Sequence, residues 1–129
     1  MDTIGEFITR IRNAGAARHE KVDIPSSNVR VGIAKILLEN GYIRSFKVVR
    51  DGKQGVMRVY LKYNEKGRPV ISAIDRVSRP GRRVYVKSTD IPSVRDGYGI
   101  AILSTNRGVV DGDKAKTENL GGELLCNVW

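Results

Sequence analysis

The stretch GYGIAILSTNRGVV, residues 97–110, decides how the second half of this chain is organised. It starts as an apolar run suited to a buried strand, changes to serine, threonine, asparagine, arginine and glycine, and ends in two valines. Two apolar runs around a short polar segment with glycine are typical of successive strands. The polar segment, Ser104 to Gly108, has two interpretations: a plain hairpin turn, or a loop that docks on a polar partner.

The flanking sequence extends this strand pattern through the rest of the second half. Residues 70–78 and 82–88 are expected to form short strands around an Arg-Pro-Gly turn, and residues 88–97 a connection. Residues 108–122 are expected to hold a short strand and one helical turn, and residues 122–129 the closing strand.

The first half has a different period, starting with a helix over residues 2–15. Thr3 or Asp2 can cap its start, and Gly15 can end it in a left-handed conformation. A second helix follows the serines at 26 and 27 and ends at Gly41. The apolar residues of the first helix recur at i, i+3, i+4 and i+7: Ile4, Phe7, Ile8 and Ile11.

Strands complete the first half. Residues 21–25 are expected to form a short strand that ends at Pro25, and residues 42–49 and 56–63 a hairpin around an Asp-Gly turn. The polar segment 64–69 is the best boundary between the halves. We therefore predict an α+β fold: an N-terminal α/β subdomain, residues 1–66, in the order α-β-α-β-β, packed on a C-terminal antiparallel β subdomain, residues 67–129.

Charge is the most informative bulk property. Twenty-three lysines and arginines against fourteen acids give the 129 residues a net charge of +9, which suggests a polyanionic partner. A basic amphipathic helix or dense lysine cluster is not seen, and no apolar run is long enough to span a bilayer, so we expect no membrane partner. The first ten residues do not resemble a signal peptide, and the single cysteine fits a reducing, cytoplasmic compartment.

The run RVSRPGRRVYVK, residues 76–87, carries five cations and no acid. A solvated face is the ordinary explanation for such a run. Four of the five cations are arginines, however, and the guanidinium group matches phosphate and stacks on bases. The run therefore favours contact with nucleic acid.

Catalytic chemistry finds little support in the sequence. His19 has no group to orient it as a base, and Cys126 lies in an apolar strand as a small core side chain. The acids of residues 111–118 do not have the spacing of a calcium loop, and the glycines follow no nucleotide-binding pattern. We therefore expect no enzyme activity, no metal, no cofactor and no small-molecule substrate.

The polar segment 104–108 suits RNA better. Ser104, Thr105 and Asn106 offer short donors and acceptors, Arg107 offers a phosphate contact, and Gly108 allows a close backbone approach. Proteins read RNA mainly at irregular sites, through such groups and through stacking on flat side chains. Tyr85 in the basic run has the chemistry either to stack on a base or to pack in the core.

These motifs resemble those of a known family, the eighth in the series of bacterial small-subunit ribosomal proteins. The similar segments run nearly end to end, and the most specific are the Arg-Val-Ser-Arg-Pro-Gly motif and the serine–threonine loop. They are ITRIRNA (8–14), IPSSNVRVGIAKIL (24–37), GYIRSFKV (41–48), LKY (61–63), RVSRPGRRVY (76–85), GYGIAILSTNRGVV (97–110) and NLGGELLCNVW (119–129).

The resemblance implies a structural constituent of the small ribosomal subunit in the cytoplasm, which binds the central domain of small-subunit rRNA directly and early in assembly. It also implies contacts with neighbouring small-subunit proteins, and in several bacteria repression of translation through a similar site on the mRNA of its own operon. The residues that the resemblance carries over as a primary RNA site are Ser104, Thr105, Asn106, Tyr85, Gly122 and Glu123, and those of a secondary site are Arg10, Arg12 and Asn13. The chemistry of the residues adds Arg107 and Gly108 of the loop and Arg79, Arg82 and Arg83 of the basic run to the primary site.

Two positions depart from the pattern usual in the family. Asn106 stands where a serine is frequent, and it keeps a donor and an acceptor but is bulkier and lacks the hydroxyl. Arg107 stands where lysine is common, which preserves the charge but changes its geometry. The alternative function, from another class, is a non-specific basic nucleic-acid-binding protein of the nucleoid.

Overall fold

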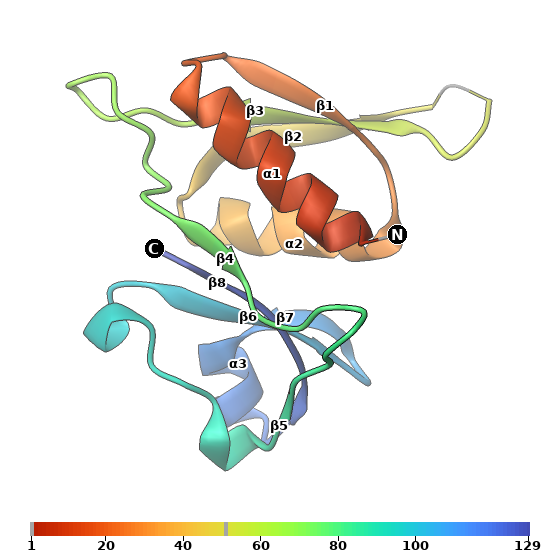
Figure 1. Ribbon diagram of the computed structural model, residues 1–129, viewed down its shortest axis with the longest axis vertical. Coiled ribbons are helices and arrows are strands. Elements are labelled where there is room, and N and C mark those ends of the chain that lie inside the picture. The colour runs from red at the N-terminus through yellow and green to blue at the C-terminus, as the bar shows by residue number, and fades with distance from the viewer. Residues whose placement is uncertain (1, 51) are drawn as a thin grey trace.

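Two β-sheets occupy the two ends of the long axis of the molecule (Figure 1), in a computed structural model that describes residues 2–50 and 52–129. The first is three-stranded, with the order β1-β3-β2; the second is five-stranded, with the path β4-β8-β6-β7 and β5 paired to β8. All strand pairs are antiparallel. The predicted α+β fold is confirmed, including the order α-β-α-β-β in the first half.

The elements of the first half are α1 (Thr3–Ala16), β1 (Lys21–Pro25), α2 (Asn28–Glu39), β2 (Ile43–Val49) and β3 (Val56–Leu61). Those of the second half are β4 (Ile74–Arg76), β5 (Tyr85–Val86), the 3-10 turns η1 (Ser88–Asp90) and η2 (Arg95–Gly97), β6 (Ile100–Thr105), β7 (Gly108–Asp111), α3 (Gly112–Thr117) and β8 (Gly122–Val128).

Helix α1 begins as predicted and ends differently. The Asp2 carboxylate caps it by accepting the Gly5 N–H at 3.0 Å. The prediction that Gly15 ends it was wrong, because Gly15 lies inside the helix and Arg18 takes the left-handed conformation with φ 59°. The His19 N–H then reaches the Ala14 carbonyl at 2.9 Å and the Arg18 N–H the Gly15 carbonyl at 3.1 Å, which satisfies two carbonyls of the last turn.

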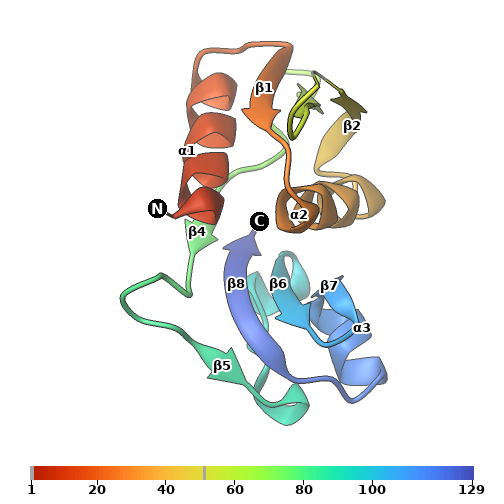
Figure 2. The same cartoon turned by 90° about the vertical axis from the view of Figure 1, so that its right-hand side faces the viewer.

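Helix α2 and the two strands β2 and β3 of the hairpin follow the predictions, while Asp51 of the predicted Asp-Gly turn lies outside the described residues. Ser27 caps α2 through the Arg30 N–H, and Gly41 follows its end with a positive φ. In β3, Met57, Val59 and Leu61 are buried and alternate with partly exposed residues, so only one face of the sheet is covered. Both α1 and α2 lie on that covered side (Figures 1 and 2).

The second sheet is organised around β8. This strand pairs with β4 and β5 on one side and with β6 on the other. The two short strands predicted around the Arg-Pro-Gly turn are present, but they pair with β8 rather than with each other. Of the basic run, only Arg76, Tyr85 and Val86 lie in strands; Arg79, Arg82 and Arg83 belong to the turn segment. The basic run therefore follows one edge of the sheet, from the end of β4 through the turn to β5.

The two halves share one core. The larger apolar cluster contains residues of α1, α2 and the first sheet, and also Ile74, Ile102, Leu125, Cys126 and Val128 of the second half. Helix α2 contacts β7 directly, which places it between the two sheets (Figure 2). Cys126 is buried, as predicted, and burial raises the pKa of its thiol to about 12. A second cluster joins α3 to the outer side of β6 and β8.

Candidate nucleic-acid interface

A row of three side chains crosses the second sheet at the positions predicted to contact RNA. Glu123 of β8 is paired with Tyr85 of β5 on one side and with Ser104 of β6 on the other. Directly paired residues in antiparallel strands place their side chains on the same face. Tyr85, Glu123 and Ser104 therefore lie side by side on one face, although they are far apart in the sequence.

Tyr85 is 70% exposed, which answers the question that the sequence left open. It is not a core residue. An aromatic ring held on a strand and largely in solvent is available for stacking.

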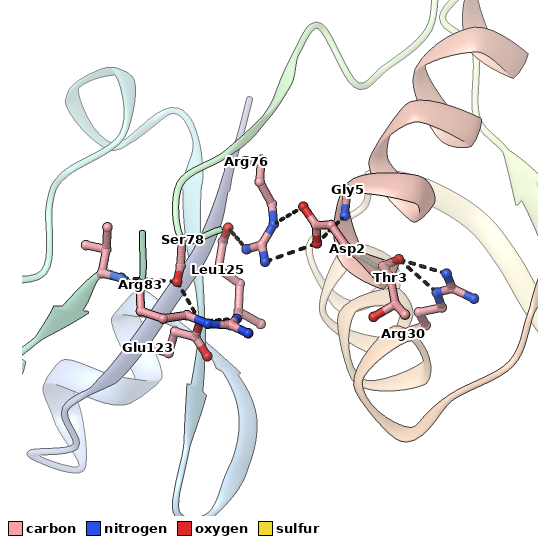
Figure 3. Close-up of polar contacts among 10 residues, drawn as sticks. Asp2, Thr3, Gly5, Arg30, Arg76, Ser78, Arg83, Glu123 and Leu125 are labelled. Atoms are coloured by element: carbon pink, nitrogen blue, oxygen red, sulfur yellow. Dashed lines mark hydrogen bonds and ion pairs between the residues drawn. The ribbon is translucent and has the colours of Figure 1, made fainter. Parts of the chain in front are cut away.

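Glu123 is held by a polar network with Ser78 and Arg83 (Figure 3). The Ser78 hydroxyl donates to it at 2.5 Å and the Arg83 guanidinium at 2.9 Å, while Ser78 itself accepts the Val84 N–H at 3.1 Å. Burial alone raises the pKa of Glu123, but the Ser78 and Arg83 contacts outweigh it and the pKa lies below its usual value. The ionised Glu123 thus fixes Arg83 and the start of β5.

Arg79 and Arg82 close the turn before β5. Their backbones exchange hydrogen bonds of 3.0 and 2.9 Å, so the turn is rigid although it carries two cations. Both residues are exposed, and their side chains have no hydrogen bond or ion pair with any residue that the structure describes. Two guanidinium groups without a partner among the described residues therefore lie in the turn that precedes β5.

The serine–threonine segment forms a hairpin tip rather than an interruption of the strand. Ser104 and Thr105 belong to β6, and Thr105 pairs with Gly108, so only Asn106 and Arg107 lie in the turn. The Thr105 hydroxyl donates to the Gly108 carbonyl at 2.8 Å and accepts the Arg107 N–H at 3.1 Å. Gly108 has φ 97°, as a turn that ends in a left-handed glycine requires. The plain-hairpin interpretation is thus correct for the backbone.

Polar groups without a protein partner remain at this tip. Within the described part of the chain, the Ser104 hydroxyl and the Asn106 amide make no hydrogen bond, and Arg107 has only Glu118 at 3.6 Å. Gly122 lies against the backbone of Ser104 and Thr105: a Cβ there would come within 2.2 Å of the Ser104 carbonyl oxygen, so the closeness of β6 and β8 at this row requires glycine.

The predicted secondary site lies on α1. Arg10 is engaged by Glu6 at 3.1 Å and by the Asp23 carbonyl at 3.0 Å, and Asn13 is exposed. Arg12 donates to the Ile74 carbonyl and reaches toward the second half. One surface groove is lined by both Arg12 and Arg79, which brings the predicted secondary and primary sites to the same side of the molecule.

Arg76 differs from the rest of the basic run. Its side chain is only 7% exposed, and it bonds the Asp2 carboxylate and the Leu125 carbonyl (Figure 3). Arg30 of α2 is buried in the same manner against the Thr3 and Pro25 carbonyls. Nothing in the sequence separates these two arginines from the exposed ones, because most of their partners are distant along the chain: Asp2 and Leu125 for Arg76, and Thr3 for Arg30.

Other chemistry is sparse. Within residues 2–50 and 52–129, no three His, Cys, Asp or Glu side chains come close enough to hold a metal ion. None of the helices formed by these residues has the length and apolar character needed to cross a bilayer.

Comparison with known proteins assigns the family. The family model of ribosomal protein S8 matches residues 2–129. The small ribosomal subunit protein uS8 of Bdellovibrio bacteriovorus is 64% identical over 129 residues, all of both chains. Those of Solibacter usitatus and Geotalea uraniireducens are 56% and 54% identical over 128 residues, 99% of this chain and 98% and 97% of theirs. With the family match over nearly its whole length, this chain belongs to the ribosomal protein S8 family.

Proposed function

We propose that this chain is a structural constituent of the small ribosomal subunit that binds the central domain of small-subunit rRNA directly, early in assembly, through the surface described above. The relatives named above carry a small-subunit name, which supports the place in that particle. As a member of a ribosomal protein family, the chain is not an enzyme. The family also agrees with the predicted location, the cytoplasmic ribosome.

The observation that carries the proposal is the row Tyr85–Glu123–Ser104. It joins an exposed aromatic ring and an unsatisfied hydroxyl, with the turn of Arg79 and Arg82 on one flank and the Asn106–Arg107 tip near the other. These are the three kinds of group that RNA recognition uses: a stacking platform, short hydrogen-bonding groups and phosphate-binding cations.

The row and its two flanks have separate roles. Arg79, Arg82 and Arg107 supply phosphate contacts and most of the salt-dependent affinity. Tyr85, Ser104 and Asn106 supply selectivity for an irregular helix, because their neutral groups reach bases and 2′-hydroxyls. Glu123 keeps Arg83 in place, and its own carboxylate has room left to accept from a base amino group.

The same surface would serve any RNA with the same shape. A site on the mRNA of the chain's own operon that resembles the rRNA site would compete for it, and translation would then be repressed when free protein accumulates. Neighbouring small-subunit proteins would contact the faces that the RNA leaves open.

The test is binding of the purified full chain to a central-domain rRNA fragment and to a scrambled duplex of equal length, across a salt series. A preference for the rRNA fragment that persists at high salt supports the proposal. Equal and steeply salt-dependent binding to both would instead identify a non-specific nucleic-acid-binding protein of the nucleoid.

A matched pair of variants sharpens the test. The variant Tyr85→Ala/Ser104→Ala removes the neutral groups of the row, and Tyr98→Ala/Ser93→Ala removes the same residue types at exposed positions outside it. Neither changes the net charge. Loss of the preference in the first and not in the second would locate selectivity in the row.

A further inference from the structure

A cavity of about 330 Å³ lies at the seam between the two halves, away from the row. Its walls come from the C-terminal half of α1, the end of β3 and the segment 69–74 that leads into β4. Most of the wall is apolar: Ile11, Leu61, Pro69 and Ile71 line it, together with the ring of Tyr42. The volume is in the range of small-molecule sites and is ample for one planar base.

The lining of the cavity carries positive charge. Arg12, Arg18 and Lys62 line it, and the lining contains no aspartate or glutamate. Arg12 has partners, the Ile74 carbonyl and, at 3.9 Å, Asp75. The side chains of Arg18 and Lys62 are exposed, and no described residue forms a hydrogen bond or an ion pair with either. The occupant that fits these charges is therefore an anion with an apolar part.

The walls are held in place by hydrogen bonds from both halves. The N–H groups of Ser72 and Ala73 donate to the Trp129 carbonyl at 2.7 and 2.9 Å, and the Val70 N–H donates to the Lys62 carbonyl at 2.9 Å. The Tyr42 hydroxyl donates to the Tyr98 carbonyl at 3.3 Å. The cavity is thus formed before any ligand arrives, which lowers the cost of binding.

We infer that this seam cavity receives one unpaired nucleotide of the bound RNA, with the base against the apolar wall and Tyr42 and the phosphate at Arg18 and Lys62. The inference rests on the proposed function, since rRNA is the polyanion that the chain is proposed to bind. An unpaired nucleotide combines a flat apolar base with an adjoining negative charge, and proteins bind such nucleotides by stacking plus a basic margin. The predicted RNA contact Arg12 lines the same cavity.

The experiment titrates the full chain with a single-stranded RNA tetranucleotide and follows backbone amide signals by NMR. We expect shifts at Ile71, Ser72 and Ala73. Inorganic phosphate alone should not reproduce them, because it lacks the base. Shifts confined to the Tyr85 row, or the same shifts with phosphate alone, would overturn the inference. Displacement of the tetranucleotide from the cavity by a short acidic peptide with one leucine would favour a protein segment as the occupant and would also overturn it.

A matched pair of variants completes the test. Arg18→Ala/Lys62→Ala should weaken tetranucleotide binding about tenfold, whereas Arg68→Ala/Lys66→Ala, which removes the same charges from the exposed 64–69 segment, should stay within about twofold. Equal weakening in both variants would mean that net charge alone binds the tetranucleotide and would overturn the inference. The rRNA-fragment preference is measured on the same variants. If the preference for the rRNA fragment persists while the tetranucleotide fails to bind the cavity, the inference fails and the proposed function stands. If the unchanged chain shows no preference for the rRNA fragment, the proposed function fails.

Discussion

Arg76 joins Asp2, the N-cap residue of helix α1, to Leu125 of β8, the last strand of the chain. Its guanidinium donates to both carboxylate oxygens of Asp2 at 3.3 Å and to the Leu125 carbonyl at 2.8 Å (Figure 3). Asp2 also caps α1 through the Gly5 N–H. Arg76 therefore helps to set the orientation of α1 relative to β8, and so of the predicted secondary RNA site relative to the primary one, together with the Arg12 contacts and the shared apolar core.

Arg76→Ala is therefore expected to destabilise the fold by about 2–4 kcal/mol, because it leaves the Leu125 carbonyl without its donor and the Asp2 carboxylate without its counter-charge. Chemical denaturation of the two proteins measures the difference. The control is Arg79→Ala, an exposed arginine of the same run, which should change the free energy of unfolding by no more than about 0.5 kcal/mol. Equal effects of the two substitutions would contradict this role for Arg76.

Acid should weaken the fold through Asp2 and Glu123. For Asp2, burial raises the pKa, but the Gly5 N–H and Arg76 lower it more, and the pKa of Glu123 is lowered in the same balance by Ser78 and Arg83. Both folded pKa values thus lie below the unfolded ones, about 3.9 and 4.3. The stabilisation is complete above the unfolded-state pKa values. It is lost as the pH falls through the lower pKa values of the folded state, because in this range the unfolded state binds more protons than the folded state does.

The measurement is the free energy of unfolding between about pH 6 and pH 2, for the unchanged chain and for Asp2→Asn/Glu123→Gln. The variant should be less stable at neutral pH and should lose less stability on acidification. Parallel curves for the two proteins would show that these carboxylates do not carry the acid sensitivity.

Local signals in the sequence were sufficient for most elements. The period of Ile4, Phe7, Ile8 and Ile11 fixed α1, because a helix buries one stripe, and Ser27 with Gly41 bounded α2 through caps that need only neighbouring residues. The exception, Gly15, shows the limit of such signals. Arg18 adopts the positive φ instead of Gly15. This conformation is unfavourable for a residue other than glycine, and the two hydrogen bonds of the last turn offset the strain.

Contacts between residues far apart in the chain could not be predicted from the sequence. The partners of Arg76 lie 74 and 49 positions away, so its burial is not visible in a run of like charges. The pairing of β4 and β5 with β8 depends on register across the whole second half, and that register is what places Tyr85 beside Glu123 and Ser104. The resemblance named the site residues one by one; the register is what gathers several of them into one row.

The free cations of the turn should set the salt dependence of RNA binding. Replacing Arg79 or Arg82 with alanine should lower the slope of log K against log salt by about one, because one phosphate contact is lost. Arg68→Ala, an exposed arginine of the 64–69 segment, should leave the slope unchanged. A slope that stays the same in the Arg79 and Arg82 variants would mean that these arginines make no phosphate contact and serve only the structure of the turn.

Tyr85 should contribute by stacking. Tyr85→Ala is expected to weaken binding to the rRNA fragment by about 1–3 kcal/mol, with fold stability unchanged because the ring is outside the core. Tyr98, 88% exposed and distant from the row, is the matched control, and Tyr98→Ala should bind as the unchanged chain does. An equal loss from both would mean that exposed aromatic area in general, and not the row, attracts the RNA.

Single substitutions of Ser104 and Thr105 should have different effects on stability and on RNA binding. The Thr105 hydroxyl holds the turn through Gly108 and Arg107, so Thr105→Ala should cost about 1 kcal/mol of stability, whereas Ser104→Ala, with no internal bond to lose, should cost almost none. Both together should weaken specific rRNA binding by about 1–3 kcal/mol and leave duplex binding little changed. Denaturation and RNA titration of the two single variants distinguish the roles. If Ser104→Ala binds the rRNA fragment normally while Thr105→Ala does not, recognition depends on the shape of the hairpin tip, and the free hydroxyl of Ser104 has no part in it.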